Sequence, residues 1–151
     1  MLTISSLEKQ RELQEGYSAL PQNVKNFYNR KNIKINVSTK DYIGTVNTRK
    51  SIGYTHFTYR DGAFLSADVY VCGSSFMPPR YTLYHELGHI LDSAGGYNSY
   101  SANWEGWTEM QPYSPSQVYS SSEAFAEAFA GYFERPDKLK NMEIGFNPPC
   151  F

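Results

Sequence analysis

The string His-Glu-Leu-Gly-His at residues 85–89 constrains the fold and chemistry of this chain more than any other feature. On a helix, His85 and His89 lie four residues apart, so both imidazoles leave the same face one turn from each other. This spacing lets two neutral ring nitrogens bind one zinc ion, each at about 2 Å from it. Glu86 then flanks a water at the metal, where its carboxylate can take the proton. The motif predicts a helix that carries two metal ligands and a general base.

Length and charge narrow the class of protein. With 151 residues, the chain can bury a hydrophobic core, and we predict one domain over residues 1–151. The formal net charge of −1 gives no indication of a nucleic-acid or membrane partner. No apolar run reaches the roughly 18 residues that span a bilayer, and residues 1–14 lack the apolar segment of a secretory signal peptide. We expect a protein without a membrane span that is cytoplasmic, exported by another route, or a mature form.

Two helices are predicted before the first strand. Leucines spaced among charged residues predict a helix that Gly16 can stop. Pro21 can start a second helix, in which Val24, Phe27 and Tyr28 form an apolar stripe.

Alternating patterns then predict a small mixed or antiparallel sheet. Residues 33–37 alternate between apolar and polar side chains, which is typical of a half-buried strand. The β-rich runs 51–59 and 63–71 are separated by Arg60-Asp61-Gly62, which predicts a hairpin. Cys72, just after it, and Cys150 form no CxxC motif, and we expect buried thiols rather than a bridge.

The motif helix is predicted over residues 80–94, between Pro78-Pro79 and Gly95-Gly96. Residues 95–113 have no clear period and predict a long irregular loop. A further helix is predicted over residues 120–134, with Ser121 or Ser122 as its N-cap. The core face of the motif helix is expected to consist of Leu83, Leu87, Ile90 and Leu91. The sequence therefore predicts an α+β fold, with a small sheet packed on helices.

A catalytic zinc site needs a third protein ligand and one open position. On a straight helix, Asp92 would lie about 10.5 Å along the axis from His85, too far to bind the same ion. We expect Asp92 to accept a hydrogen bond from a neighbouring group instead, with exposure to solvent as the alternative. Glu123 and Glu127 share one face of the later helix, beside alanines small enough for close approach to the motif helix. We assign Glu123 as the third ligand and Glu127 as the carboxylate that orients a ligand histidine, with the reverse assignment left open.

Other polar residues are weaker candidates for the site. Glu105 and Glu109 are expected to be solvated charges in the loop. His56 alternates with aromatic residues on its strand, which favours a hydrogen-bonded sheet histidine over a metal ligand.

The two motifs together, His85–His89 and Glu123-Ala-Phe-Ala-Glu127-Ala-Phe, resemble the catalytic domain of anthrax toxin lethal factor and the related bacterial Pro-Pro endopeptidases. The resemblance extends over roughly residues 20–140. It implies a zinc endopeptidase in which His85, His89 and Glu123 bind the metal and Glu86 is the general base. It also implies that Glu127 braces a ligand.

The same resemblance implies a tyrosine that stabilises the tetrahedral intermediate. The spacing of the family places it at Ser116, which is not a tyrosine. The role then moves to Tyr119 or Tyr113 or is lost, and we assign it to Tyr119.

The sequence thus predicts a monomeric zinc endopeptidase that cleaves protein or peptide substrates. Substrate is expected to dock as an extra strand along an edge of the sheet. The segment Phe64 to Val71 is the first candidate for this edge. An interior position of the same segment in the hairpin is an equal alternative. A catalytically silent binding module stabilised by zinc is a second hypothesis, although a structural site has no use for Glu86. A third is an intracellular regulatory protease acting on a repressor, which the absence of a DNA-binding segment disfavours.

Overall fold

The computed structural model describes residues 4–38, 44–46, 49–72, 78–96, 99 and 120–134. The chain forms two compact units, of which the first runs to Glu86 and the second begins at Leu87, inside helix α3. The elements in chain order are α1 (Ile4–Ala19), α2 (Gln22–Asn29), β1 (Asn32–Ser38), β2 (Gly44–Val46), β3 (Arg49–Ser51), β4 (Gly53–Arg60), β5 (Ala63–Cys72), α3 (Pro79–Ala94) and α5 (Ser121–Glu134). This composition of helices and a small sheet confirms the predicted α+β class.

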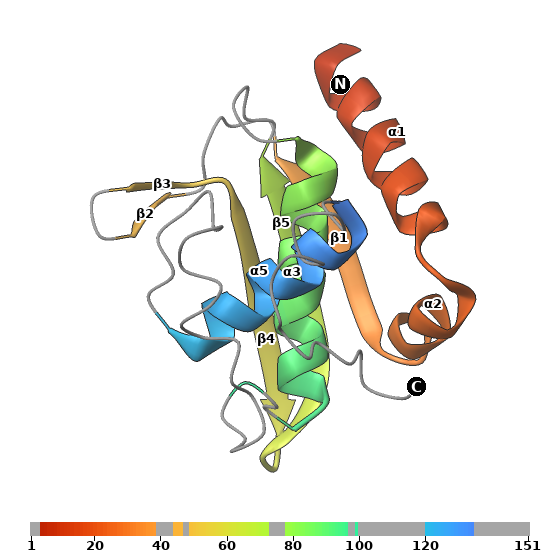
Figure 1. Cartoon of the computed structure of the whole chain (residues 1–151). Coiled ribbons are helices and arrows are strands. Elements are labelled where there is room, and N and C mark those ends of the chain that lie inside the picture. The colour runs from red at the N-terminus through yellow and green to blue at the C-terminus, as the bar shows by residue number, and fades with distance from the viewer. Residues whose placement is uncertain are drawn as a thin grey trace. The chain divides into compact units, whose positions relative to one another are not determined.

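The sheet of the first unit is mixed, with the strand order β1-β5-β4 (Figure 1). β1 runs parallel to β5, with Ile35 opposite Val69, and β4 runs antiparallel to β5. Val69 and Val71 are fully buried, and both α1 and α2 contact β1. Because β5 is the central strand, the interpretation of Phe64 to Val71 as a sheet edge is wrong, and its alternative as an interior strand is confirmed. β2 and β3, which were not predicted, pair as a separate antiparallel ribbon.

The predicted hairpin joins β4 to β5 through a two-residue turn. Asp61 and Gly62 both have positive φ, at 52° and 78°. Two successive residues in this region are typical of a type I′ turn, whose twist matches that of the flanking strands. The Asp-Gly pair therefore sets the pairing of Arg60 with Ala63, and a register shift between Thr58 and Tyr59 then places His56 opposite Asp68.

Gly16 does not end the first helix, because α1 continues to Ala19. A Cβ atom at Gly16 would lie 2.6 Å from Cγ of Arg80, so the missing side chain makes room for the start of α3. The Tyr84 hydroxyl donates a buried hydrogen bond of 2.6 Å to the Gly16 carbonyl oxygen. The glycine thus serves helix packing rather than helix termination.

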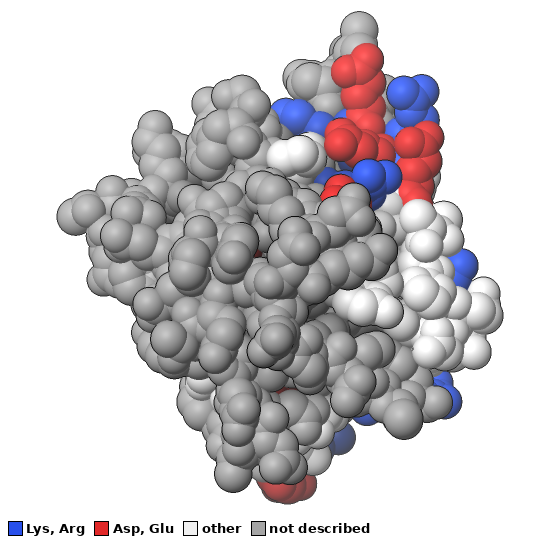
Figure 2. All heavy atoms as spheres, in the orientation of Figure 1, with Lys and Arg blue, Asp and Glu red and all other residues white. Residues whose placement is uncertain are grey.

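On the outer surface of α1, acidic and basic side chains are interspersed (Figure 2), and Arg11 pairs with Glu15 at 3.7 Å.

The second helix follows the prediction closely. Pro21 is the N-cap of α2, and Val24 and Tyr28 are buried.

Cys72 is buried at the end of β5 as expected, while Cys150 lies outside the described residues. None of the helices in the described part of the chain has the length and apolarity needed to cross a membrane.

The core of the second unit combines the later half of α3 with α5. Leu87, Ile90 and Leu91 from α3 are at most 1% exposed. Four alanines of α5 and Phe129 are equally buried. Small side chains at these positions allow two helices to approach closely.

Candidate metal centre

Helix α3 presents the His-Glu-Leu-Gly-His motif on a well-anchored segment. It begins at Pro79, one residue before the predicted start, and ends at Ala94, where the Gly95 N–H bonds to the Leu91 carbonyl oxygen at 2.9 Å. Leu83, Leu87, Ile90 and Leu91 are buried, as predicted. With that face in the core, His85 and His89 are half-buried on another face of the same helix.

The start of helix α5 positions Glu123. The Glu123 N–H donates to Oγ of Ser120 at 3.2 Å, so Ser120 is the N-cap and the predicted caps Ser121 and Ser122 are wrong. Ser120 and Glu123 have the spacing of a capping box, in which the glutamate side chain would turn back to the N-cap N–H. Here Oε1 of Glu123 instead lies 3.1 Å from Nε2 of His89.

The close approach of α5 to Gly88 brings Glu123 to His89. A Cβ atom at Gly88 would lie 3.1 Å from Cβ of Phe129, which is tighter than ordinary van der Waals contact. The glycine between the two motif histidines therefore has a steric role, which the sequence pattern alone did not reveal.

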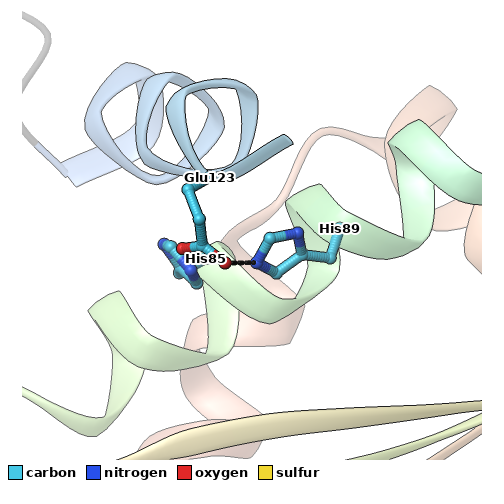
Figure 3. A group of neighbouring side chains, drawn as sticks. All are labelled: His85, His89 and Glu123. Carbon is cyan, nitrogen blue, oxygen red and sulfur yellow. Dashed lines mark ion pairs between the residues drawn. The ribbon is translucent and has the colours of Figure 1, made fainter. Parts of the chain in front are cut away.

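His85, His89 and Glu123 form a group that could hold a metal ion (Figure 3). Each residue offers one ligand atom, and these atoms all lie within 4.8 Å of one another. His85 and His89 are held one turn apart by the continuous helix, and the pairing of His89 with Glu123 lies within the second unit.

The chemistry of these donors fits zinc. Two ligand atoms that are each about 2.0–2.1 Å from a tetrahedral zinc lie about 3.3 Å apart. The observed distance of 3.1 Å between Nε2 of His89 and Oε1 of Glu123 is close to this value. A lone pair on a neutral imidazole and a carboxylate oxygen repel at that distance, so a cation or a proton has to lie between them. Two imidazoles and one carboxylate are also a known donor set for catalytic zinc.

The other ring nitrogen of His89 has a polar neighbour. Nδ1 lies 3.3 Å from Oγ of Ser122, at the long end of hydrogen-bond distances. When Nδ1 carries the proton and donates it to this oxygen, Nε2 keeps the lone pair that a metal needs. Ser122 was predicted as a cap of helix α5, but its hydroxyl oxygen lies near the ring of His89.

Glu86 is buried, with 5% of its surface exposed. Oγ1 of Thr55, on β4, donates a hydrogen bond of 2.6 Å to its Oε2 atom. Sequence reasoning gave Thr55 no role. Strand alternation could have placed it on the helix-covered face of β4, but no local signal says which strand contacts the motif helix.

The structure also describes three of the remaining candidates, Asp92, Glu127 and His56. Asp92 is 1% exposed and accepts hydrogen bonds from the Ser99 N–H at 2.8 Å and the Ser99 hydroxyl at 2.6 Å, which confirms the predicted role. Among the described residues, Glu127 is not part of the metal group, and it is buried at 3% exposure. His56 is an exposed strand residue and is also not part of that group. The candidates Glu105, Glu109, Tyr113 and Tyr119 lie outside the described residues.

Comparison with known proteins does not identify a family for this chain. No protein-family model matches the chain, and a search of curated proteins finds no significant match.

Proposed function

We propose that this protein is a zinc endopeptidase, with His85, His89 and Glu123 as metal ligands and Glu86 as the general base. The observation that carries the proposal is the metal group itself, whose ligand atoms lie within 4.8 Å of one another. The resemblance of the two motifs to the lethal factor catalytic domain supports the same assignment. A structural zinc site would use its ligands alone, whereas here a glutamate follows the first ligand histidine directly.

A zinc ion bound by these three side chains would act as a Lewis acid toward water and the scissile carbonyl. Glu86 accepts the proton of the attacking water and then passes it to the leaving amine nitrogen. A carboxylate suits both steps because it can exist in either protonation state. We assign stabilisation of the oxyanion to Tyr119, as the resemblance implies.

Substrate is proposed to pair with the edge of β4. In the described residues, β4 is an outer strand of the three-stranded sheet, and one of its side chains contacts Glu86. An extended peptide along such an edge gains main-chain hydrogen bonds, while side-chain pockets give specificity. This assignment replaces the earlier candidate edge at Phe64 to Val71, which is internal.

The test is cleavage-site profiling on a diverse peptide mixture that includes Pro-Pro sequences. Zinc-loaded protein is expected to cleave a subset of the peptides, and chelated protein and the Glu86→Ala variant are expected to cleave none. The Glu86→Ala variant should still bind zinc, which separates loss of the base from loss of the metal. Equal signal from the wild-type protein and Glu86→Ala would contradict the proposal and favour a silent binding module.

A further inference from the structure

Strand β4 holds the carboxylate of Glu86, and we propose that Thr55 is the residue that positions Glu86 for proton transfer. The inference rests on the proposed function, because it concerns how the general base of that reaction is oriented. The residues that carry it, Gly53, Thr55, Thr82 and Glu86, all lie in the first unit.

The hydrogen bond from Thr55 is short and its acceptor is buried. Oγ1 of Thr55 lies 2.6 Å from Oε2 of Glu86, within the range of hydrogen bonds from a hydroxyl to a carboxylate. With 5% of its surface exposed, Glu86 depends on protein donors in place of most of the water around an exposed carboxylate. The hydroxyl thus supplies a directional contact to one oxygen of the base.

Gly53 leaves room for the other oxygen of the carboxylate. A Cβ atom at this position would collide with Oε1 of Glu86, and it would also lie 2.7 Å from Cγ2 of Thr82. Gly53 and Thr55 are two residues apart, so they share one face of β4. The two carboxylate oxygens are therefore distinguished: Oε2 accepts from the threonine hydroxyl, and Oε1 occupies the space above the glycine.

This arrangement matters for catalysis because a base works only within hydrogen-bond reach of the proton it takes. A glutamate side chain has three rotatable bonds, and displacement of a reacting group by about 1 Å can lower a rate on the order of 100-fold. Thr55 contacts Glu86 rather than the reacting atoms, so it acts as a positioning residue. It also ties the base to the strand along which substrate is proposed to lie.

The experiment compares kcat and KM in Thr55→Val, Thr55→Ser and Ser66→Ala. Valine keeps the shape of threonine and removes the hydroxyl, and serine keeps the hydroxyl. Ser66 lies on the central strand β5, outside the proposed substrate edge. It is three residues from Val69, the partner of Thr55, so its side chain faces away from Glu86 and Ser66→Ala is the matched loss of a hydroxyl. We expect Thr55→Val to lower kcat by about 10–100-fold with KM unchanged. Thr55→Ser should recover most of the loss, and Ser66→Ala should match the wild-type protein.

A second readout does not depend on activity. The 13C chemical shift of Glu86 Cδ in zinc-loaded protein should move in Thr55→Val and stay unchanged in Ser66→Ala. Gly53→Ala should move it as well, because the added methyl displaces the carboxylate while the Thr55 hydroxyl remains. Zinc affinity should be the same in the wild-type protein and Thr55→Val, since the hydroxyl of Thr55 bonds to Glu86, which is not a proposed ligand.

The possible failures are distinguishable. If wild-type protein binds zinc but cleaves no peptide, the proposed function fails and the positioning role with it. If wild-type protein is active and Thr55→Val is equally active, only the positioning role is overturned. The same conclusion follows if Ser66→Ala loses as much kcat as Thr55→Val, because the effect would then not depend on the contact with Glu86.

Discussion

Gly88 lies directly against Ala126, so that a Cβ atom at position 88 would come within 2.9 Å of the Ala126 Cα atom. This Cα atom belongs to the backbone, which cannot move away as a flexible side chain can. Gly88 therefore determines how closely α5 approaches α3 in the second unit. Because Glu123 reaches His89 from the same helix α5, the spacing of the metal ligands depends on this contact.

The first prediction is that Gly88→Ala weakens zinc binding and lowers the free energy of unfolding by about 1–3 kcal/mol, the usual cost of overpacking. Alanine in a helix interior would by itself raise stability by up to about 1 kcal/mol. A loss therefore separates the steric effect from helix propensity. Chemical denaturation and zinc titration of the variant test both parts. Unchanged zinc affinity would show that the contact does not set the ligand spacing.

The second prediction concerns Asp92. Asp92→Asn should lower the free energy of unfolding by about 1–3 kcal/mol, because an amide can offer only one oxygen to the two Ser99 donors. Zinc affinity should be unchanged, because the carboxylate binds Ser99 rather than the metal. Ser99→Ala is the matched control, since it removes the hydroxyl donor and keeps the N–H donor, and its loss should be smaller. A large loss of zinc affinity in Asp92→Asn would make Asp92 a ligand.

The parts of the fold with strong local signals were predicted well. Helix α3 differs from the prediction by only one residue at its start. Its bounds could be predicted because prolines precede and glycines follow a segment with a periodic core face. The β4–β5 hairpin follows from Asp61-Gly62, which favours positive φ at both positions. The exclusion of Asp92 as a ligand of the same ion as His85 also follows from local geometry, because the rise of a helix per residue is fixed.

The errors arise where distant segments meet. The central position of β5 depends on parallel pairing with β1, such as Ile35 with Val69, which no local alternation encodes. Gly16 has the sequence context of a helix stop, yet its role comes from Arg80 and Tyr84, more than sixty residues later. Thr55 was missed for the same reason, since its partner Glu86 lies on another element.

The third prediction concerns stability at high pH. Burial raises the pKa of Tyr28 well above its ordinary value of 10.0, and the charge of Tyr17 raises it further. The folded state therefore favours the neutral phenol. Its contribution to stability is fully present below pH 10, where the unfolded chain is also neutral, and is lost as the pH rises through the folded-state pKa.

Above pH 10, the free energy of unfolding should fall by up to about 1.4 kcal/mol per pH unit through this group alone. Tyr28→Phe should remove that part of the slope. Tyr54→Phe is the control, because the Tyr54 side chain is 48% exposed in the folded state. Denaturation series between pH 9 and pH 11 measure the three slopes. Equal slopes for the wild-type protein and Tyr28→Phe would contradict the assignment.

The central claim is that His85, His89 and Glu123 share one metal ion, and calorimetric titration of zinc into the wild-type protein and Glu123→Ala tests it most directly. We predict about one zinc ion per chain in the wild-type protein, as a single three-ligand site requires. Glu123→Ala should lower the affinity by more than about 100-fold, since loss of a residue that only orients a ligand already costs 10–100-fold. No zinc uptake by the wild-type protein, or equal affinity in the two proteins, would contradict the account.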